Sequence, residues 1–267
     1  MLLTLSTQVL LGLKLEFHPY LFIIFFATFF EYNLHRFIPF FKYRNRIIDH
    51  KYDWVKRNTS LFHFLVLVSA IGFLIAIYFA QKEVLLVLTP IAVITFFYSI
   101  PLFKSKNRWV RLRDIPYLKL FLIATVWSSA TILLPVIHAP IKFASGNVYL
   151  MLLERFFFIL AITIPFDIRD MQTDQQLGLK TLPHLLKPTQ SYQLAILCMV
   201  IFWLVSVLHY TILNNQFILI PISLSAISTI YFLSSRKIRQ HTLYHYGILD
   251  GTMIIQGLMI VLVQLCK

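Results

Sequence analysis

The chain has 267 residues, of which 58% are hydrophobic and 13% are charged, with a formal net charge of +13. An ordinary soluble domain has about 25% charged residues, and the mean hydropathy here is +0.75, so the composition excludes a soluble protein and indicates a membrane protein. Basic loops beside anionic lipid headgroups account for the positive charge better than a nucleic-acid ligand, and no nucleic acid is expected.

Apolar runs separated by basic or proline-rich stretches predict nine membrane-spanning helices. Each run except the first is long enough to cross about 30 Å of hydrocarbon, and the runs are continuous, which favours helices over barrel strands. The predicted fold is therefore all-α, a polytopic helical bundle forming one domain over 1–267, with a first helix that is short or truncated. In chain order, the predicted spans are 2–14, 18–41, 61–80, 84–103, 116–138, 147–166, 190–211, 216–233 and 247–266.

The loops between these spans differ sharply in charge. The loops 42–60, 104–115, 167–189 and 234–246 carry 17 Lys and Arg residues, whereas the loops on the other side carry three, Lys14, Lys82 and Lys142. Because basic loops stay in the cytoplasm, this bias predicts a cytoplasmic N-terminus and an outside C-terminus. We expect an integral protein of a bacterial inner (plasma) membrane, with the site loops on the cytoplasmic side.

The end of the sixth span carries the most distinctive segment, FDIRDMQTDQQLGLKTLPHLL from Phe166 to Leu186. Asp167, Asp170 and Asp174 have the spacing i, i+3 and i+7, which places three carboxylates on one helix face. Such a group favours a hard cation, and Mg²⁺ binds carboxylates together with substrate phosphates. The pattern predicts a Mg²⁺–diphosphate site; the alternative is a solvated polar loop.

This segment resembles the second aspartate motif of the UbiA prenyltransferase superfamily, which has the form D-x-x-D-x-x-x-D, then glycine, then K-T-L-P. Here Asp167, Asp170 and Asp174 are followed by Gly178 and by 180–183, KTLP. The resemblance implies a UbiA-like bundle in which the three aspartates are the catalytic, Mg²⁺-binding residues. It also implies the reaction, transfer of a prenyl group from a prenyl diphosphate to a small aromatic, quinone or lipid acceptor.

A second stretch, YSIPLFKSKNRWVRLRDIPYLK, is similar to the Y-S-x-P region of the same family. In the family, basic residues after this region help to hold the diphosphate, and such charges would neutralise the leaving group. The alternative for each of them is ordinary positive charge of a cytoplasmic loop. The residues predicted to bind substrate on this basis are Tyr98, Lys104, Lys106, Arg111, Arg113 and Lys180.

The family's first motif, N-x-x-x-D-x-x-x-D, is incomplete, so the chain resembles a divergent member. Asn33 matches the asparagine and is predicted to bind substrate, but Phe37 and Phe41 stand at the aspartate positions. Two metal-binding carboxylates are therefore missing from the second span.

Three explanations compete for the missing carboxylates. Asp49 and Asp53 have the required i, i+4 spacing in the adjacent loop, and Glu31 is a candidate lone substitute. Alternatively Arg36, with His35, contacts an anionic group directly, because arginine binds phosphate without a metal. We count Arg36 among the predicted substrate-binding residues.

Other ionisable residues inside the spans have no assigned role. Glu154 and Arg155 are neighbours that point about 100° apart on a helix, and Asp250 is either a cap or part of a polar cavity wall. Cys198 and Cys266 lack metal-ligand spacing and are interpreted as packing residues.

Two functions remain open. The first is a Mg²⁺-dependent prenyltransferase, and the second is a catalytically degenerate protein that binds a prenyl lipid or a partner without turnover. A transporter is less favoured, because seven glycines give no convincing broken helices.

Overall fold

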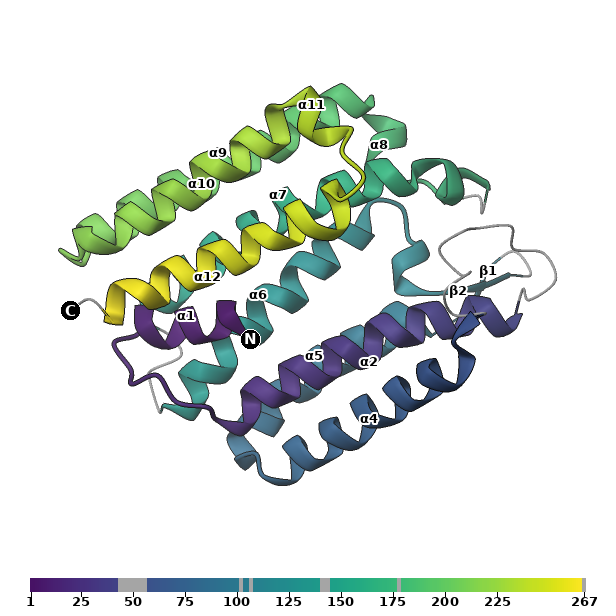
Figure 1. The fold of residues 1–267 in the computed structure, drawn as a ribbon, viewed down its shortest axis with the longest axis horizontal. Coiled ribbons are helices and arrows are strands. Elements are labelled where there is room, and N and C mark those ends of the chain that lie inside the picture. The colour runs from purple at the N-terminus through teal and green to yellow at the C-terminus, as the bar shows by residue number, and fades with distance from the viewer. Residues whose placement is uncertain (43–56, 101–102, 106–107, 140–144, 177–178, 266–267) are drawn as a thin grey trace. The chain divides into compact units, whose positions relative to one another are not determined.

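Figure 1 shows the computed structural model of the chain, which describes residues 1–42, 57–100, 103–105, 108–139, 145–176 and 179–265. Side chains are described in the same ranges except at 35–42, 103–105, 108–109, 176 and 264–265. The helices are α1 (Leu2–Leu10), α2 (Pro19–Lys42), α4 (Thr59–Tyr78), α5 (Lys82–Ser99), α6 (Leu118–His138), α7 (Gly146–Gln176), α8 (Leu182–Leu185), α9 (Pro188–Ile212), α10 (Leu219–Ser234), α11 (Arg236–Arg239) and α12 (Asp250–Leu265).

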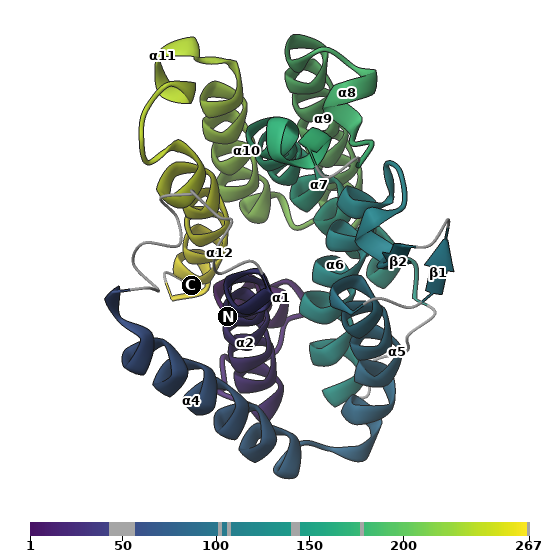
Figure 2. The same ribbon diagram turned by 90° about the vertical axis from the view of Figure 1, so that its right-hand side faces the viewer.

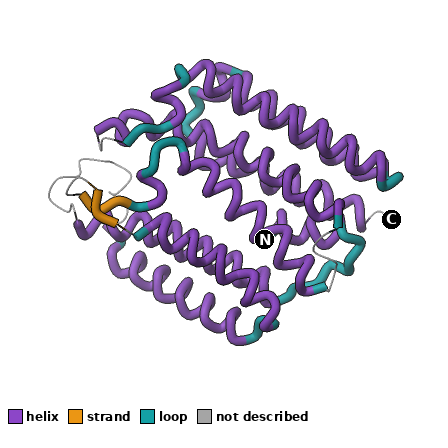
Figure 3. Tube along the Cα trace, turned by 180° about the vertical axis from the view of Figure 1, so that it is seen from behind, coloured by secondary structure: helices purple, strands orange, loops and turns teal. Residues whose placement is uncertain are grey.

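The all-α prediction is confirmed, with one small addition. Two short strands, β1 (Phe103–Ser105) and β2 (Arg108–Val110), pair antiparallel within the predicted loop 104–115. Figure 3 shows this hairpin as the one patch of strand in the described chain. Short helical turns complete the list: η2 (Leu112–Asp114), η3 (Gln216–Ile218) and η4 (Tyr244–Leu249), of which η4 is a π-helix.

Seven helices in the described part of the chain are long and apolar enough to cross a membrane. This establishes an integral membrane bundle, although the predicted count of nine spans is not established. The helix α1 has nine residues, which at about 1.5 Å per residue cannot cross the hydrocarbon core. The helix α2 has 24 residues, and its described apolar part is Pro19–Leu34.

The chain divides into two compact units, one of Glu16–Leu85 and one of Leu2–Leu15 with Leu86–Lys267. In the first unit α2 packs against α4. Gly72 makes this approach close, because a Cβ added there would lie 2.5 Å from the Phe26 ring. Small residues commonly allow such packing between membrane helices.

Six helices of the second unit form a closed series in which each contacts the next. The order is α6, α7, α9, α10, α12, α1 and back to α6 (Figure 2). The core between them contains the fully buried side chains of Phe158, Ile162 and Tyr244. Among these helices, α7 has the most buried membrane-length segment in the described part of the chain, and it packs against both α6 and α9.

The helix α7 differs from the predicted span 147–166, because it continues to Gln176. The residues beyond the span, from Asp167 to Gln176, contain no glycine or proline to interrupt the helix. The three aspartates therefore lie on the last three turns of a continuous helix rather than in a loop.

The segment before α6 has a strained conformation at its last residue. Tyr117 has φ 65° and caps α6 in the left-handed region, which costs a non-glycine residue about 1 kcal/mol or more. Its backbone N–H donates a hydrogen bond to the carbonyl of Lys180 at 3.4 Å. This bond ties the start of α6 to the chain that follows α7.

Candidate functional site

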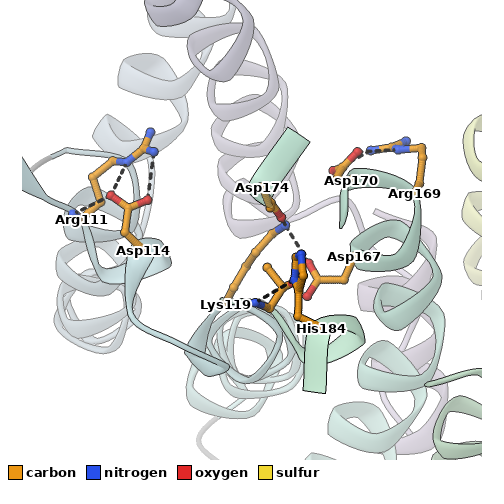
Figure 4. A network of polar contacts seen from close by, with 9 residues as sticks. Arg111, Asp114, Lys119, Asp167, Arg169, Asp170, Asp174 and His184 are labelled. Atoms are coloured by element: carbon orange, nitrogen blue, oxygen red, sulfur yellow. Dashed lines mark hydrogen bonds and ion pairs between the residues drawn. The ribbon is translucent and has the colours of Figure 1, made fainter. Parts of the chain in front are cut away.

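Two of the three predicted aspartates meet at one point, and a lysine lies between them. Lys119 Nζ is 2.7 Å from Asp167 Oδ1 and 3.3 Å from Asp174 Oδ2. The side chains of Lys119, Asp167 and Asp174 are 13%, 3% and 7% exposed. Figure 4 shows the lysine reaching from α6 to both carboxylates of α7. We call Lys119, Asp167 and Asp174 the carboxylate–lysine cluster.

Helix geometry explains why these two aspartates come together. Seven residues make nearly two turns, so Asp167 and Asp174 differ by only about 20° around α7. Asp170 lies about 60° away around the helix, at 3.6 residues per turn. All three aspartates therefore share one face of α7, as predicted, but only Asp167 and Asp174 contact Lys119.

Asp170 is paired with its neighbour Arg169. The guanidinium Nε lies 2.8 Å from Asp170 Oδ1, and Nη2 lies 3.1 Å from Oδ2. The Arg169 guanidinium carbon also lies 5.1 Å from the centroid of the Phe166 ring and 5.2 Å from that of the Tyr246 ring. Figure 4 shows Asp170 directed toward this arginine and away from Lys119.

The three aspartates do not form a three-carboxylate metal site in this arrangement. Among the described residues, no group of three or more His, Cys, Asp or Glu side chains is placed to hold a metal ion. The volume between Asp167 and Asp174, where a cation would bind, contains the ammonium of Lys119. The predicted Mg²⁺ therefore stays a prediction.

A small polar turn lies beside the cluster and comes from the predicted KTLP stretch. Thr181 caps α8, and its Oγ1 is 2.7 Å from His184 Nδ1. Figure 4 shows His184 on the short helix α8. Thr181 is buried whereas Lys180 is exposed, so this stretch anchors the chain after α7 and leaves the Lys180 side chain accessible.

The predicted basic residues before α6 have different surroundings. Arg111 forms a two-pronged pair with Asp114, with distances of 2.9 and 3.1 Å. The Arg113 guanidinium carbon lies 5.5 Å from the centroid of the Tyr98 ring, which is cation–π range. Lys104 lies in β1 with no described side chain, and Lys106 lies outside the described residues.

The predicted residues of the first motif belong to the first unit. Asn33 is 6% exposed, and its Nδ2 donates to the Phe29 carbonyl at 2.7 Å. Glu31 is half-buried on the same helix. Arg36 and His35 lie in α2 without described side chains, and Asp49 and Asp53 lie outside the described residues.

A second buried polar cluster lies closer to the other end of α7, around Glu154. Glu154 Oε1 is 2.7 Å from His209 Nδ1 on α9, and Arg155 Nη2 reaches Ser6 and Thr7 of α1 at 3.4 and 3.5 Å. Glu154 and Arg155 also line a cavity of about 10 Å³ at the junction of the six helices, which is room for about one water. This cluster connects α7 to α9 and α1.

Sequence reasoning did not single out Lys119 or His209. Both lie inside predicted spans, 116–138 and 190–211, where an ionisable side chain faces the bundle interior and is paired or functional. That signal was available for both residues. Their partners were not predictable, because Lys119 and Asp174 are 55 positions apart in the sequence.

No family model and no curated protein matches this sequence. One solved structure is similar, described as a digeranylgeranylglyceryl phosphate synthase in membranes. The two chains share 17% identity at a TM-score of 0.56, and the match covers 98% of this chain and 90% of the other. At this identity the likeness shows the fold alone, which is an all-α membrane bundle.

Proposed function

We propose that the protein is a UbiA-like membrane prenyltransferase that uses a prenyl diphosphate and a small acceptor. The observation that carries the proposal is the buried pair Asp167 and Asp174 at the end of α7, in a chain with the fold of a prenyl-lipid synthase. The KTLP turn beside this pair and the basic segment before α6 supply the other polar groups that such a site needs.

The proposed reaction breaks the bond between the allylic carbon and the diphosphate oxygen. The electron pair of that bond leaves with the diphosphate, and a lone pair of the acceptor forms the new bond to the carbon. The acceptor then loses a proton to solvent. Cations near the leaving oxygen stabilise its developing charge, and Arg113 and Lys180 are the described basic residues we assign to this role.

A second candidate is a protein that binds a prenyl lipid without turnover, and the carboxylate–lysine cluster favours it. Two carboxylates and one ammonium leave one net negative charge, which does not attract a diphosphate. Phe37 and Phe41 stand at the two positions where the family resemblance would place further metal-binding aspartates. Both observations weaken the case for ordinary metal-assisted catalysis.

Turnover decides between the two candidates. Membranes containing the protein are incubated with labelled prenyl diphosphates of several chain lengths and with aromatic, quinone and lipid acceptors. A lipid-soluble product that is lost in Asp174→Asn but kept in the exposed control Glu83→Gln supports the transferase. Absence of product with every pair, together with binding of an uncharged prenyl lipid to purified protein, supports the binder.

We place the site on the cytoplasmic side of a bacterial plasma membrane. The support is the excess of basic residues in the loops that adjoin Asp174 and Arg113. A prenyl diphosphate has a charged head and an apolar tail, so this placement suits a substrate that enters from the cytoplasm and the lipid.

A further inference from the structure

We propose that the ammonium of Lys119 takes the place of a divalent cation between Asp167 and Asp174, so that this cluster does not bind Mg²⁺. The inference deepens the proposed function, on which it rests only for the identity of the ligand. It concerns the charge that holds the two carboxylates together, and it can be tested without substrate.

The contacts show that Lys119 is a built part of the site. Its Nζ lies 2.7 Å from one carboxylate and 3.3 Å from the other. The two aspartates are nine-tenths or more buried, as their exposed fractions of 3% and 7% show. A surface lysine that paired by chance would not be expected to bridge two buried acids from a different helix.

Two buried carboxylates at one point require a cation. Removal from water costs several kcal/mol per ion, and only a close opposite charge offsets this cost. A Mg²⁺ ion would bind these oxygens at about 2.0–2.1 Å, in the volume that the ammonium occupies. Since the two cations repel each other, the cluster has room for one of them.

The remaining ligands of a metal site are missing from the cluster. Asp170, the third carboxylate of the pattern, is paired with Arg169. Mg²⁺ prefers octahedral coordination by oxygens, and the Lys119 ammonium lies at the carboxylate oxygens that a metal would need. The described residues therefore favour the ammonium over the metal.

The backbone at the start of α6 places Lys119 beside the end of α7. Lys119 is in the first turn of α6, two residues after Tyr117, whose left-handed conformation starts the helix. The hydrogen bond from Tyr117 to the Lys180 carbonyl holds this turn beside α7. Strain kept at such a point is typical of functional sites.

The chemical consequence is a site with a fixed, singly charged cation. The Lys119 ammonium donates a hydrogen bond to Asp174 Oδ2 at 3.3 Å and forms an ion pair with Asp167 Oδ1 at 2.7 Å. It therefore offsets one of the two buried negative charges without a divalent metal. Replacing the lysine by a neutral residue would create the missing metal site.

The test measures thermal unfolding of the purified full-length protein in detergent, with EDTA or with excess MgCl₂. The reference is the triple variant Lys119→Met/Asp167→Asn/Asp174→Asn, which lacks the whole cluster. The difference between the unfolding midpoints of the wild type and the triple variant should be the same in EDTA and in MgCl₂. Lys119→Met should unfold at a lower temperature in EDTA and recover in MgCl₂, because a ligand that binds only the folded state stabilises it.

Three matched variants separate a metal site from loss of a structural contact. Lys119→Arg keeps the charge and should stay insensitive to Mg²⁺. Lys119→Met/Asp174→Asn removes one of the two carboxylates and should lose the recovery in MgCl₂. Lys237→Met removes an exposed lysine of α11 and should behave as wild type, which controls for the change in net charge.

Two outcomes would overturn the proposal. One is a wild-type midpoint that rises with MgCl₂ relative to the triple variant, since this would mean that the native aspartates bind the metal. The other is a Lys119→Met protein with no response to MgCl₂. If Lys119→Met does not fold, Mn²⁺ binding measured by electron paramagnetic resonance decides, because wild-type protein should bind no more Mn²⁺ than Asp167→Asn.

Failure of the proposed function would look different. If no prenyl product forms with any substrate but Lys119→Met still gains a Mg²⁺ response, the lysine assignment stands and the transferase proposal fails. If product forms in MgCl₂, is abolished by EDTA and needs Asp174, the transferase proposal stands and the lysine assignment fails.

Discussion

Glu154 and His209 form the shortest described side-chain link between α7 and α9. Their Oε1 and Nδ1 atoms are 2.7 Å apart, and their side chains are 6% and 1% exposed. Tyr210 OH adds a longer contact to the other carboxylate oxygen at 3.5 Å. The pair therefore joins α7 to α9 in the buried interior of the second unit.

Removal of one partner of this pair should be costly. His209→Leu leaves Glu154 buried without its imidazole, and loss of one partner of a buried pair costs about 3–5 kcal/mol of unfolding free energy. Glu154→Gln/His209→Leu should recover part of the loss, because an amide carries no charge. Unfolding of purified protein in denaturant measures both.

Leu208→Ala is the control for this experiment. Leu208 precedes His209 on α9 but is 56% exposed, and an exposed substitution usually changes stability by about 0.5 kcal/mol or less. A His209→Leu protein as stable as Leu208→Ala would show that the pair does not hold the helices together.

Double-mutant cycles should distinguish Asp167, which contacts Lys119, from Asp170, which is paired with Arg169. Lys119→Met combined with Asp167→Asn should show a coupling energy of about 0.5–3 kcal/mol, as is usual for residues in contact. Lys119→Met combined with Asp170→Asn should be additive within about 0.5 kcal/mol. Equal coupling in both cycles would contradict the observed orientation of Asp170.

The crossing of α1 and α12 should depend on Gly257. A Cβ at this position would lie 2.8 Å from the backbone carbon of Leu2, so Gly257→Ala must displace α1. Overpacking of this kind costs about 1–3 kcal/mol, and it is measured as a lower midpoint of thermal unfolding.

Gly251 is the matched control on the same helix. A Cβ there has no neighbour within 4 Å, and alanine favours a helix over glycine by up to about 1 kcal/mol. We expect Gly251→Ala to be neutral or stabilising. A Gly257→Ala protein that matches it would mean that α1 does not lie against α12.

Thiol labelling should establish the orientation in the membrane. In a Cys198→Ser/Cys266→Ser background, Gln240→Cys lies in a basic loop and Gln81→Cys lies between α4 and α5. An impermeant thiol reagent added to intact cells should label Gln81→Cys only, and both should react after lysis. Labelling of Gln240→Cys in intact cells would reverse the assigned topology.

Hydrophobic patterning predicted the helices well, because each membrane span must be a continuous apolar run. The predicted helix bounds are wrong where a polar sequence continues a helix, and the predicted loops are wrong where they contain strands. The helix α7 continues from Phe166 to Gln176 through charged residues, and the basic loop contains a hairpin. Apolar runs mark the part of a helix that is in lipid, and not its end.

The site was predicted less completely than the fold. The i and i+7 spacing of Asp167 and Asp174 correctly indicated that they share a face, whereas the spacing alone did not show that Asp170 would turn to Arg169. The lysine that lies between the aspartates depends on how α6 packs against α7. No periodicity within one segment contains that information.

The left-handed backbone at Tyr117 has a consequence for how this region tolerates change. A helix turns about 100° and rises about 1.5 Å per residue, so one residue inserted between Tyr117 and Lys119 would swing the ammonium to another side of α6. Substitution of Leu118 preserves the spacing from Tyr117 to Lys119, but an insertion or deletion between them does not. The stretch from the capping tyrosine to the lysine is thus a spacer of fixed length, and natural variants should differ there in residue type and not in residue number.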